Sequence, residues 1–139
     1  MKIITEEKET RLVELFRDFQ PEILLVLLFG SYDTEYFRSD SDIDFAVLFG
    51  ANAGLMDEMK LLSRISLLLD YERADLVNLN QAPVTIQFNA LGGKIIYEKD
   101  KTITSDFLER VLRMYGDYKP VLDRFDKELL EREIPSSEY

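Results

Sequence analysis

Apolar residues recur at helical spacing near the start of the chain. Over residues 5–20 they fall at positions i, i+3, i+4 and i+7, which is the pattern of one helix face. These residues are Leu12, Leu15, Phe16 and Phe19. Thr5 is suited to cap the helix and Pro21 to end it, so a helix is predicted between them.

Four other segments have the patterns of strands. Residues 23–29 are seven consecutive apolar residues, and residues 43–49 are apolar except for Asp44. Short apolar runs of this kind predict strands with both faces covered. Residues 73–79 alternate in polarity, and residues 94–98 predict a fourth, short strand.

The segments between these strands are of two kinds. Residues 31–41 follow neither a helical nor a strand period, and a loop of this length is unusual unless it has a function. Residues 55–70 predict a helix, and residues 84–91 a shorter one that ends before two glycines. The apolar side of the longer helix is expected to consist of Leu55, Met59, Leu62 and Leu69.

The last part of the chain again follows helical spacing. Its pattern predicts a C-terminal helical segment over about residues 104–131, in which Pro120 either kinks the helix or starts a second piece. The apolar residues of this pattern are Phe107, Val111, Met114 or Tyr115, and Tyr118. Helices and strands thus alternate in an α/β order, and 139 residues suit one domain. We expect that domain at residues 1–134, followed by a flexible tail at 135–139.

The composition excludes several kinds of chemistry. The chain has no Cys and no His, so a disulfide, a thiol nucleophile, a Cys/His zinc site and a Ser/His/Asp triad are all impossible. Any metal must therefore be held by oxygen. The 17 basic and 27 acidic residues give a formal net charge of −10, which repels a nucleic-acid backbone and suits a basic protein partner.

No segment has the pattern of a membrane anchor or a signal peptide. The longest apolar run, residues 23–29, is far shorter than the ~20 residues that a membrane-spanning helix needs. The amino terminus carries Glu6, Glu7 and Glu9 where a signal peptide has an apolar core. We therefore expect a cytoplasmic protein with no membrane contact.

Three carboxylates lie where apolar residues are expected. Asp42 and Asp44 flank Ile43 at the start of the second strand and, because side chains alternate, share a face with Cα atoms about 6.6 Å apart. If the third strand neighbours the second, Asp75 can join that face. Three clustered carboxylates repel one another unless a cation holds them. Mg²⁺ prefers oxygen ligands and substrate phosphates, so this trio predicts a magnesium site.

A phosphate-binding turn is predicted upstream of these acids. Gly30 has no Cβ, so a phosphate can approach the backbone N–H groups there, and the Ser31 hydroxyl adds a donor. Gly-Ser, ten residues and then Asp-x-Asp, with a strand on each side, supply what nucleotidyl transfer needs. Taken singly, Gly30-Ser31 is a commonplace turn, and Asp42 can be read as a cap. Asp44 is harder to explain in this way, because burying an unpaired carboxylate costs free energy.

The segment from Gly30-Ser31 to Asp42-Ile43-Asp44 resembles the signature of the DNA polymerase β-like nucleotidyltransferase superfamily. The chain most resembles the minimal nucleotidyltransferases, called MNT. The resemblance lies in its small size, in the sequence of residues 39–44 and in residues 91–98. MNT proteins are the antitoxin halves of HEPN–MNT toxin–antitoxin pairs. The resemblance covers nearly the whole chain, although its specific part is only the signature together with Asp75.

The resemblance implies a fold, a reaction and a partner. The fold would be a mixed β-sheet flanked by helices, and the cofactors two Mg²⁺ ions with ATP as substrate. Asp42, Asp44 and Asp75 would be the metal ligands and catalytic residues, with Asp75 also the base for the incoming hydroxyl. Gly30 and Ser31 would hold the β- and γ-phosphates. The reaction in MNT proteins is AMP transfer to a tyrosine hydroxyl of the HEPN toxin, an RNase that is thereby silenced.

One stretch departs from the family pattern. Where many relatives carry an Ala-Arg-Gly type of run, this chain has Asp33-Thr34-Glu35, which adds two negative charges and no arginine. Arg38, further along the same loop, is the residue that can neutralise the triphosphate instead. Failing that, the expected result is slow catalysis, or neutralisation of the toxin by binding alone.

Two alternative functions stay open. One is a non-catalytic antitoxin whose acidic surface covers a basic toxin. The other is transfer of a nucleotide to a small molecule such as an aminoglycoside, although so short a chain leaves little room for an acceptor-binding domain. RNA tailing is disfavoured by the negative charge.

Overall fold

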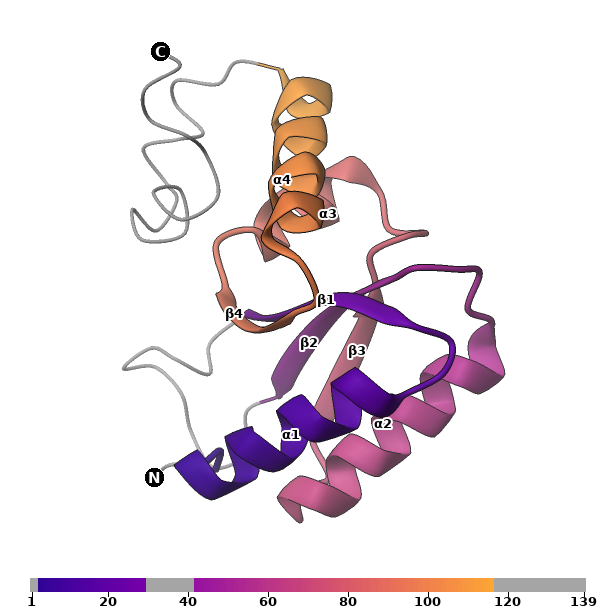
Figure 1. The fold of residues 1–139 in the computed structure, drawn as a ribbon, viewed down its shortest axis with the longest axis vertical. Coiled ribbons are helices and arrows are strands. Elements are labelled where there is room, and N and C mark those ends of the chain that lie inside the picture. The colour runs from indigo at the N-terminus through magenta and orange to yellow at the C-terminus, as the bar shows by residue number, and fades with distance from the viewer. Residues whose placement is uncertain (1–2, 30–41, 117–139) are drawn as a thin grey trace.

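A four-stranded mixed sheet with helices on both faces forms the framework of the computed structural model (Figure 1). The structure describes residues 3–29 and 42–116. Its elements are α1 (Glu6–Asp18), β1 (Ile23–Phe29), β2 (Ile43–Phe49), α2 (Leu55–Leu69), β3 (Ala74–Asn78), α3 (Val84–Ala90), β4 (Lys94–Glu98) and α4 (Lys101–Tyr115). The strand order is β3-β2-β1-β4, with β1 antiparallel to β2 and β4 and with β2 parallel to β3. The predicted α/β fold with a mixed sheet is therefore confirmed.

The two central strands send alternate side chains into two separate cores. In β2, Phe45 and Val47 belong to the core under α1 and α2, whereas Ala46 and Leu48 belong to the core under α3 and α4. Both faces of the sheet are covered in this way, as Figure 1 shows. This double burial explains why β1 and β2 are nearly continuous apolar runs.

Helix α1 forms as the pattern predicts, and α2 forms with a different buried side. The Thr5 side chain accepts a hydrogen bond from the Lys8 N–H, and Leu12 and Phe16 are buried. In α2 the buried residues are Leu61, Ile65 and Leu69. Of the residues predicted to form its apolar side, Leu69 is buried, whereas Leu55 and Met59 are 69% and 56% exposed, so that side is not the one that meets the sheet. The helix is apolar on more than one side, and spacing alone cannot choose the side that meets the sheet.

Helices α3 and α4 pack together over the other face of the sheet. Helix α4 begins at Lys101, before the predicted start at residue 104, because the Asp100 side chain caps it by accepting from the Thr102 N–H. It ends at Tyr115, where Gly116 adopts a φ of 117°, a conformation that favours glycine. The rest of the predicted helical segment and the tail at 135–139 lie outside the described residues. Within the described ranges, no helix combines the length and apolar character needed to cross a membrane.

Two asparagines close the carboxyl ends of β2 and β3. Asn80 accepts from the Phe49 N–H and donates to the Phe49 carbonyl, both at 2.8 Å, as a paired strand residue would. The buried Asn78 donates to Glu58 at 3.1 Å and accepts from the Asn80 N–H at 3.0 Å. We call Asn78 and Asn80 the amide end of the strand pair.

Candidate active site

The opposite end of the same strand pair carries the three acids. Because β2 and β3 are parallel and adjacent, Asp44 is the register partner of Asp75. Asp42 lies two residues before Asp44 and, since side chains alternate along a strand, projects from the same face. Asp42, Asp44 and Asp75 therefore share one face at one end of the pair, which we call the acidic end. The condition on which the predicted trio depended, that the third strand neighbours the second, is met.

The environment of Asp44 disfavours a negative charge. Burial is the main cause that raises the pKa of its carboxyl above the ordinary value of 3.8, and the charges of Asp75 and Asp42 raise it further. On β1 its register partner is the half-buried Phe29, so Asp44 lies between an apolar strand end and a second carboxylate. A bound cation would relieve this strain on the charged form.

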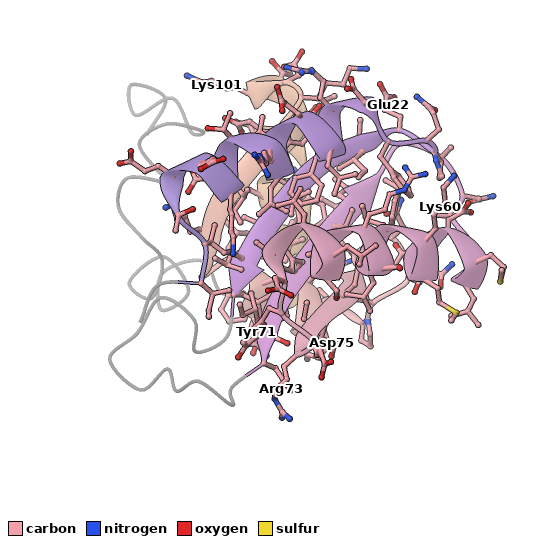
Figure 2. The ribbon with its side chains drawn as sticks, turned by 90° about the horizontal axis from the view of Figure 1, so that it is seen from below. Glu22, Lys60, Tyr71, Arg73, Asp75 and Lys101 are labelled. Carbon is pink, nitrogen blue, oxygen red and sulfur yellow. The ribbon has the colours of Figure 1, made fainter. Side chains whose placement is uncertain are left out.

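One basic residue contacts the acidic end. The Arg73 guanidinium lies 3.2 Å from an Asp42 carboxylate oxygen, and both side chains are about half exposed, at 55% and 54%. Figure 2 shows Arg73 and Asp75 at the same end of the molecule, away from Glu22. Nothing in the sequence reasoning pointed to Arg73. The available signal was its position two residues before Asp75, which places both on one side of the third strand.

The acids suit a hard cation by their chemistry, but they are not gathered around one point. Three carboxylates at a single sheet end are ligands of the kind that Mg²⁺ takes. Within residues 3–29 and 42–116, however, no three acidic side chains are placed closely enough to hold a metal ion between them. Asp42 is paired with Arg73 instead. The chemistry of the three acids therefore fits Mg²⁺, whereas their arrangement in this structure does not close a site around an ion.

Gly93 packs closely against the end of β1, beside the acids. It comes directly before β4, and a Cβ there would overlap the Leu28 carbonyl and lie 2.9 Å from the Cβ of Phe29. Only glycine permits so close an approach. The residues predicted to bind the nucleotide, Gly30, Ser31 and Arg38, follow β1 and lie outside the described residues, so their role stays a prediction.

The comparison with protein families identifies the fold. The profile of the family described as "Polymerase beta, Nucleotidyltransferase" matches residues 10–102, which include most of α1, the whole sheet and all three acids. A curated relative, the protein adenylyltransferase MntA of Shewanella oneidensis, is 33% identical over 78 residues, which are 56% of this chain and 55% of that protein. The chain thus spans about half the length of the curated relative that it matches.

Solved structures show the same fold over most of the chain. One is the tri-AMPylated Shewanella oneidensis HEPN toxin in complex with MNT antitoxin, with a TM-score of 0.66 and 28% identity over 79% of this chain and 85% of that one. Another is a toxin–antitoxin structure with AMP-PNP, with a TM-score of 0.67 and 29% identity over 77% of this chain and 86% of that one. Together with the family profile, they show that this chain belongs to the polymerase β nucleotidyltransferase family.

Proposed function

We propose that this chain is an antitoxin enzyme that transfers AMP from ATP to a tyrosine hydroxyl of a cognate HEPN-family RNase toxin. The observation that carries the proposal is the register of Asp44 with Asp75, with Asp42 on the same face. The named activity of the curated relative and the AMPylated toxin in a similar structure support this reaction over other nucleotide transfers.

The acids would hold Mg²⁺ and orient the two reactants. Bound Mg²⁺ would polarise the attacked phosphate and lower the pKa of the acceptor hydroxyl. Asp75 stands on β3, an edge strand of the sheet, and is exposed, so an incoming hydroxyl would reach its carboxylate. Its partner Asp44 lies inward, beside the end of β1 that leads to Gly30 and Ser31. We therefore assign the acceptor side to Asp75 and the nucleotide side to Gly30, Ser31 and Arg38.

The transfer itself needs no covalent intermediate. The acceptor oxygen would form a bond to the α-phosphorus as the bond from that phosphorus to the bridging oxygen of the β-phosphate breaks. Pyrophosphate leaves, and Asp75 takes the proton of the hydroxyl. Such a reaction depends on positioning and on charge neutralisation, which suits a chain without Cys or His.

Neutralisation of the toxin by binding alone is the second candidate. It is favoured by the ion pair that occupies Asp42 and by the two acids of Asp33-Thr34-Glu35, because both oppose the binding of a metal–nucleotide complex. In this case the chain would inhibit its toxin without ATP.

The test is the intact mass of a HEPN-family protein encoded beside this chain, after incubation with the chain, Mg²⁺ and ATP. We expect the mass of one or more AMP groups to be added to the toxin and its RNase activity to be lost. Asp42→Asn should abolish the added mass. Asp106→Asn, which removes an exposed carboxylate from α4, is the matched control and should leave transfer intact.

Two results would count against the enzymatic proposal. Undiminished transfer by Asp42→Asn would remove that residue from the mechanism. Full inhibition of the RNase by the wild-type chain without ATP, and equally by Asp42→Asn, would favour the binding antitoxin.

A further inference from the structure

The ion pair between Arg73 and Asp42 is held in place by the backbone of the strand pair. The Ile43 N–H donates to the Arg73 carbonyl at 2.8 Å, and Ile43 is the register partner of Ala74. Arg73 and Asp42 are thus next to each other, directly before the two parallel strands begin. Their side chains meet because the register sets them opposite each other.

The same register makes a square of four charged side chains. Arg73 and Asp42 form one row, and Asp75 and Asp44 form the next. Among the described residues, Arg73 is the only cation that forms an ion pair with any of the three acids. It therefore offsets part of the repulsion at the acidic end when no metal is present.

The Arg73 guanidinium holds the Asp42 carboxylate through one of its oxygens, and its positive charge repels a metal ion that approaches the same group. The Arg73 contact occupies an Asp42 oxygen, and the three acids do not form a metal-binding group as they stand. We propose that Arg73 is a positioning residue that competes with a divalent cation for Asp42, so that the metal site closes only when the cation displaces the guanidinium. This inference rests on the proposed function, since it concerns the same acidic site.

The ion pair that a cation would have to displace is weak. Both partners are about half exposed, and exposed ion pairs are weak. A divalent ion held by Asp42, Asp44 and Asp75 would be attracted by three carboxylates. The Arg73 guanidinium contacts only one of them. Arg73 would therefore tune the affinity of the site without preventing metal binding.

The test measures metal binding directly, with neither ATP nor toxin present. The full chain is titrated with Mn²⁺ as a probe for Mg²⁺, and free Mn²⁺ is followed by its EPR signal. Arg73→Gln should lower the Kd for Mn²⁺ about two- to fivefold, the scale of a lost exposed ion pair. Arg73→Lys keeps the charge and should bind nearly as the wild type does.

Two controls separate this role from a general effect of charge. Arg113→Gln breaks an exposed ion pair with Glu109 on α4 and changes the net charge equally, so its Kd should stay at the wild-type value. In an Asp42→Asn background, Arg73→Gln should change the Kd less than about twofold, because the contact is already absent.

An unchanged or raised Kd in Arg73→Gln, or no Mn²⁺ binding by any variant, would overturn the proposal. An equal effect in the Asp42→Asn background would do the same, since Arg73 would then act by its charge at a distance. AMP transfer with no change in Kd would leave the proposed function standing and refute only the competition. A lowered Kd without AMP transfer would support the competition and count against the proposed function.

Discussion

The two ends of the β2–β3 strand pair differ in how their polar side chains are satisfied. At the amide end, Asn80 satisfies both backbone groups of Phe49, and Asn78 has partners for its donor and its acceptor. At the acidic end, Asp44 faces Asp75, and burial adds to the cost of its charge. The amide end satisfies its polar groups within the fold, whereas the acidic end keeps repelling carboxylates together, as the proposed cation site requires.

The largest expected effect is on activity and comes from the acidic end. Asp44→Asn should reduce AMP transfer to the toxin by at least about a hundredfold, because it removes a proposed ligand of the Mg²⁺ that would offset the charge of the reacting phosphate. The thermal midpoint should not fall, since the lost charge is one that burial and Asp75 disfavour. Intact-mass rates and thermal unfolding check the two parts.

The matched control for this variant is again Asp106→Asn, which should change neither quantity. A marked fall in the thermal midpoint of Asp44→Asn would show that the acidic end does stabilise the fold, and the contrast between the two ends would fail.

A smaller effect, on stability alone, is expected at the amide end. Asn80→Ala leaves the N–H and carbonyl of the buried Phe49 without their partners, and should lower the free energy of unfolding by about 1–3 kcal/mol. AMP transfer by the folded protein should stay unchanged. Urea unfolding at a temperature where both proteins are folded measures the loss.

Asn52→Ala, at an exposed position between β2 and α2, is the comparison for this variant and should cost less than about 0.5 kcal/mol. Equal stability of the Asn80 and Asn52 variants would mean that the Phe49 backbone finds other partners, and that the amide end contributes little.

The smallest effect is a pH dependence of stability that belongs to Asp44. Its raised pKa means that the folded chain holds this proton more tightly than the unfolded chain does. The carboxyl thus favours folding below its ordinary pKa of 3.8, and that contribution is lost as the pH rises through the raised value. Relative to Asp44→Asn, the wild type should lose stability from acidic to neutral pH in metal-free buffer.

Urea unfolding of both proteins in EDTA, at several pH values, checks this sign. A wild type that gains on the variant as the pH rises would contradict it, and would indicate that Arg73 pairs with Asp44 in solution.

Most of the fold could be predicted because each strand is a continuous or alternating apolar pattern. The sites where prediction failed involve choices that spacing does not encode. Helix α2 has apolar residues on several sides, and the sheet selects Leu61 and Ile65 over Leu55 and Met59. The start of α4 was placed late because Asp100, its cap, follows a charged residue and carries no apolar signal.

The candidate site could be predicted only in part, for a related reason. Alternation places Asp42 and Asp44 on one face, but only the strand order brings Asp75 to them. The spacing of Arg73 and Asp75 places both on one side of the third strand, but the contact between Arg73 and Asp42 joins residues far apart in the sequence and depends on the strand order. Local patterns predicted which acids form the candidate site, whereas the strand pairing determines how those acids are arranged.

The close approach of Gly93 to β1 makes residue 93 far less tolerant of substitution than the core positions around it. A Cβ at residue 93 would meet backbone atoms of Leu28, which cannot turn aside, whereas apolar side chains within the two cores can repack around one another. A saturation screen should therefore accept many apolar replacements at core positions near the acidic end, and yet reject even alanine at residue 93.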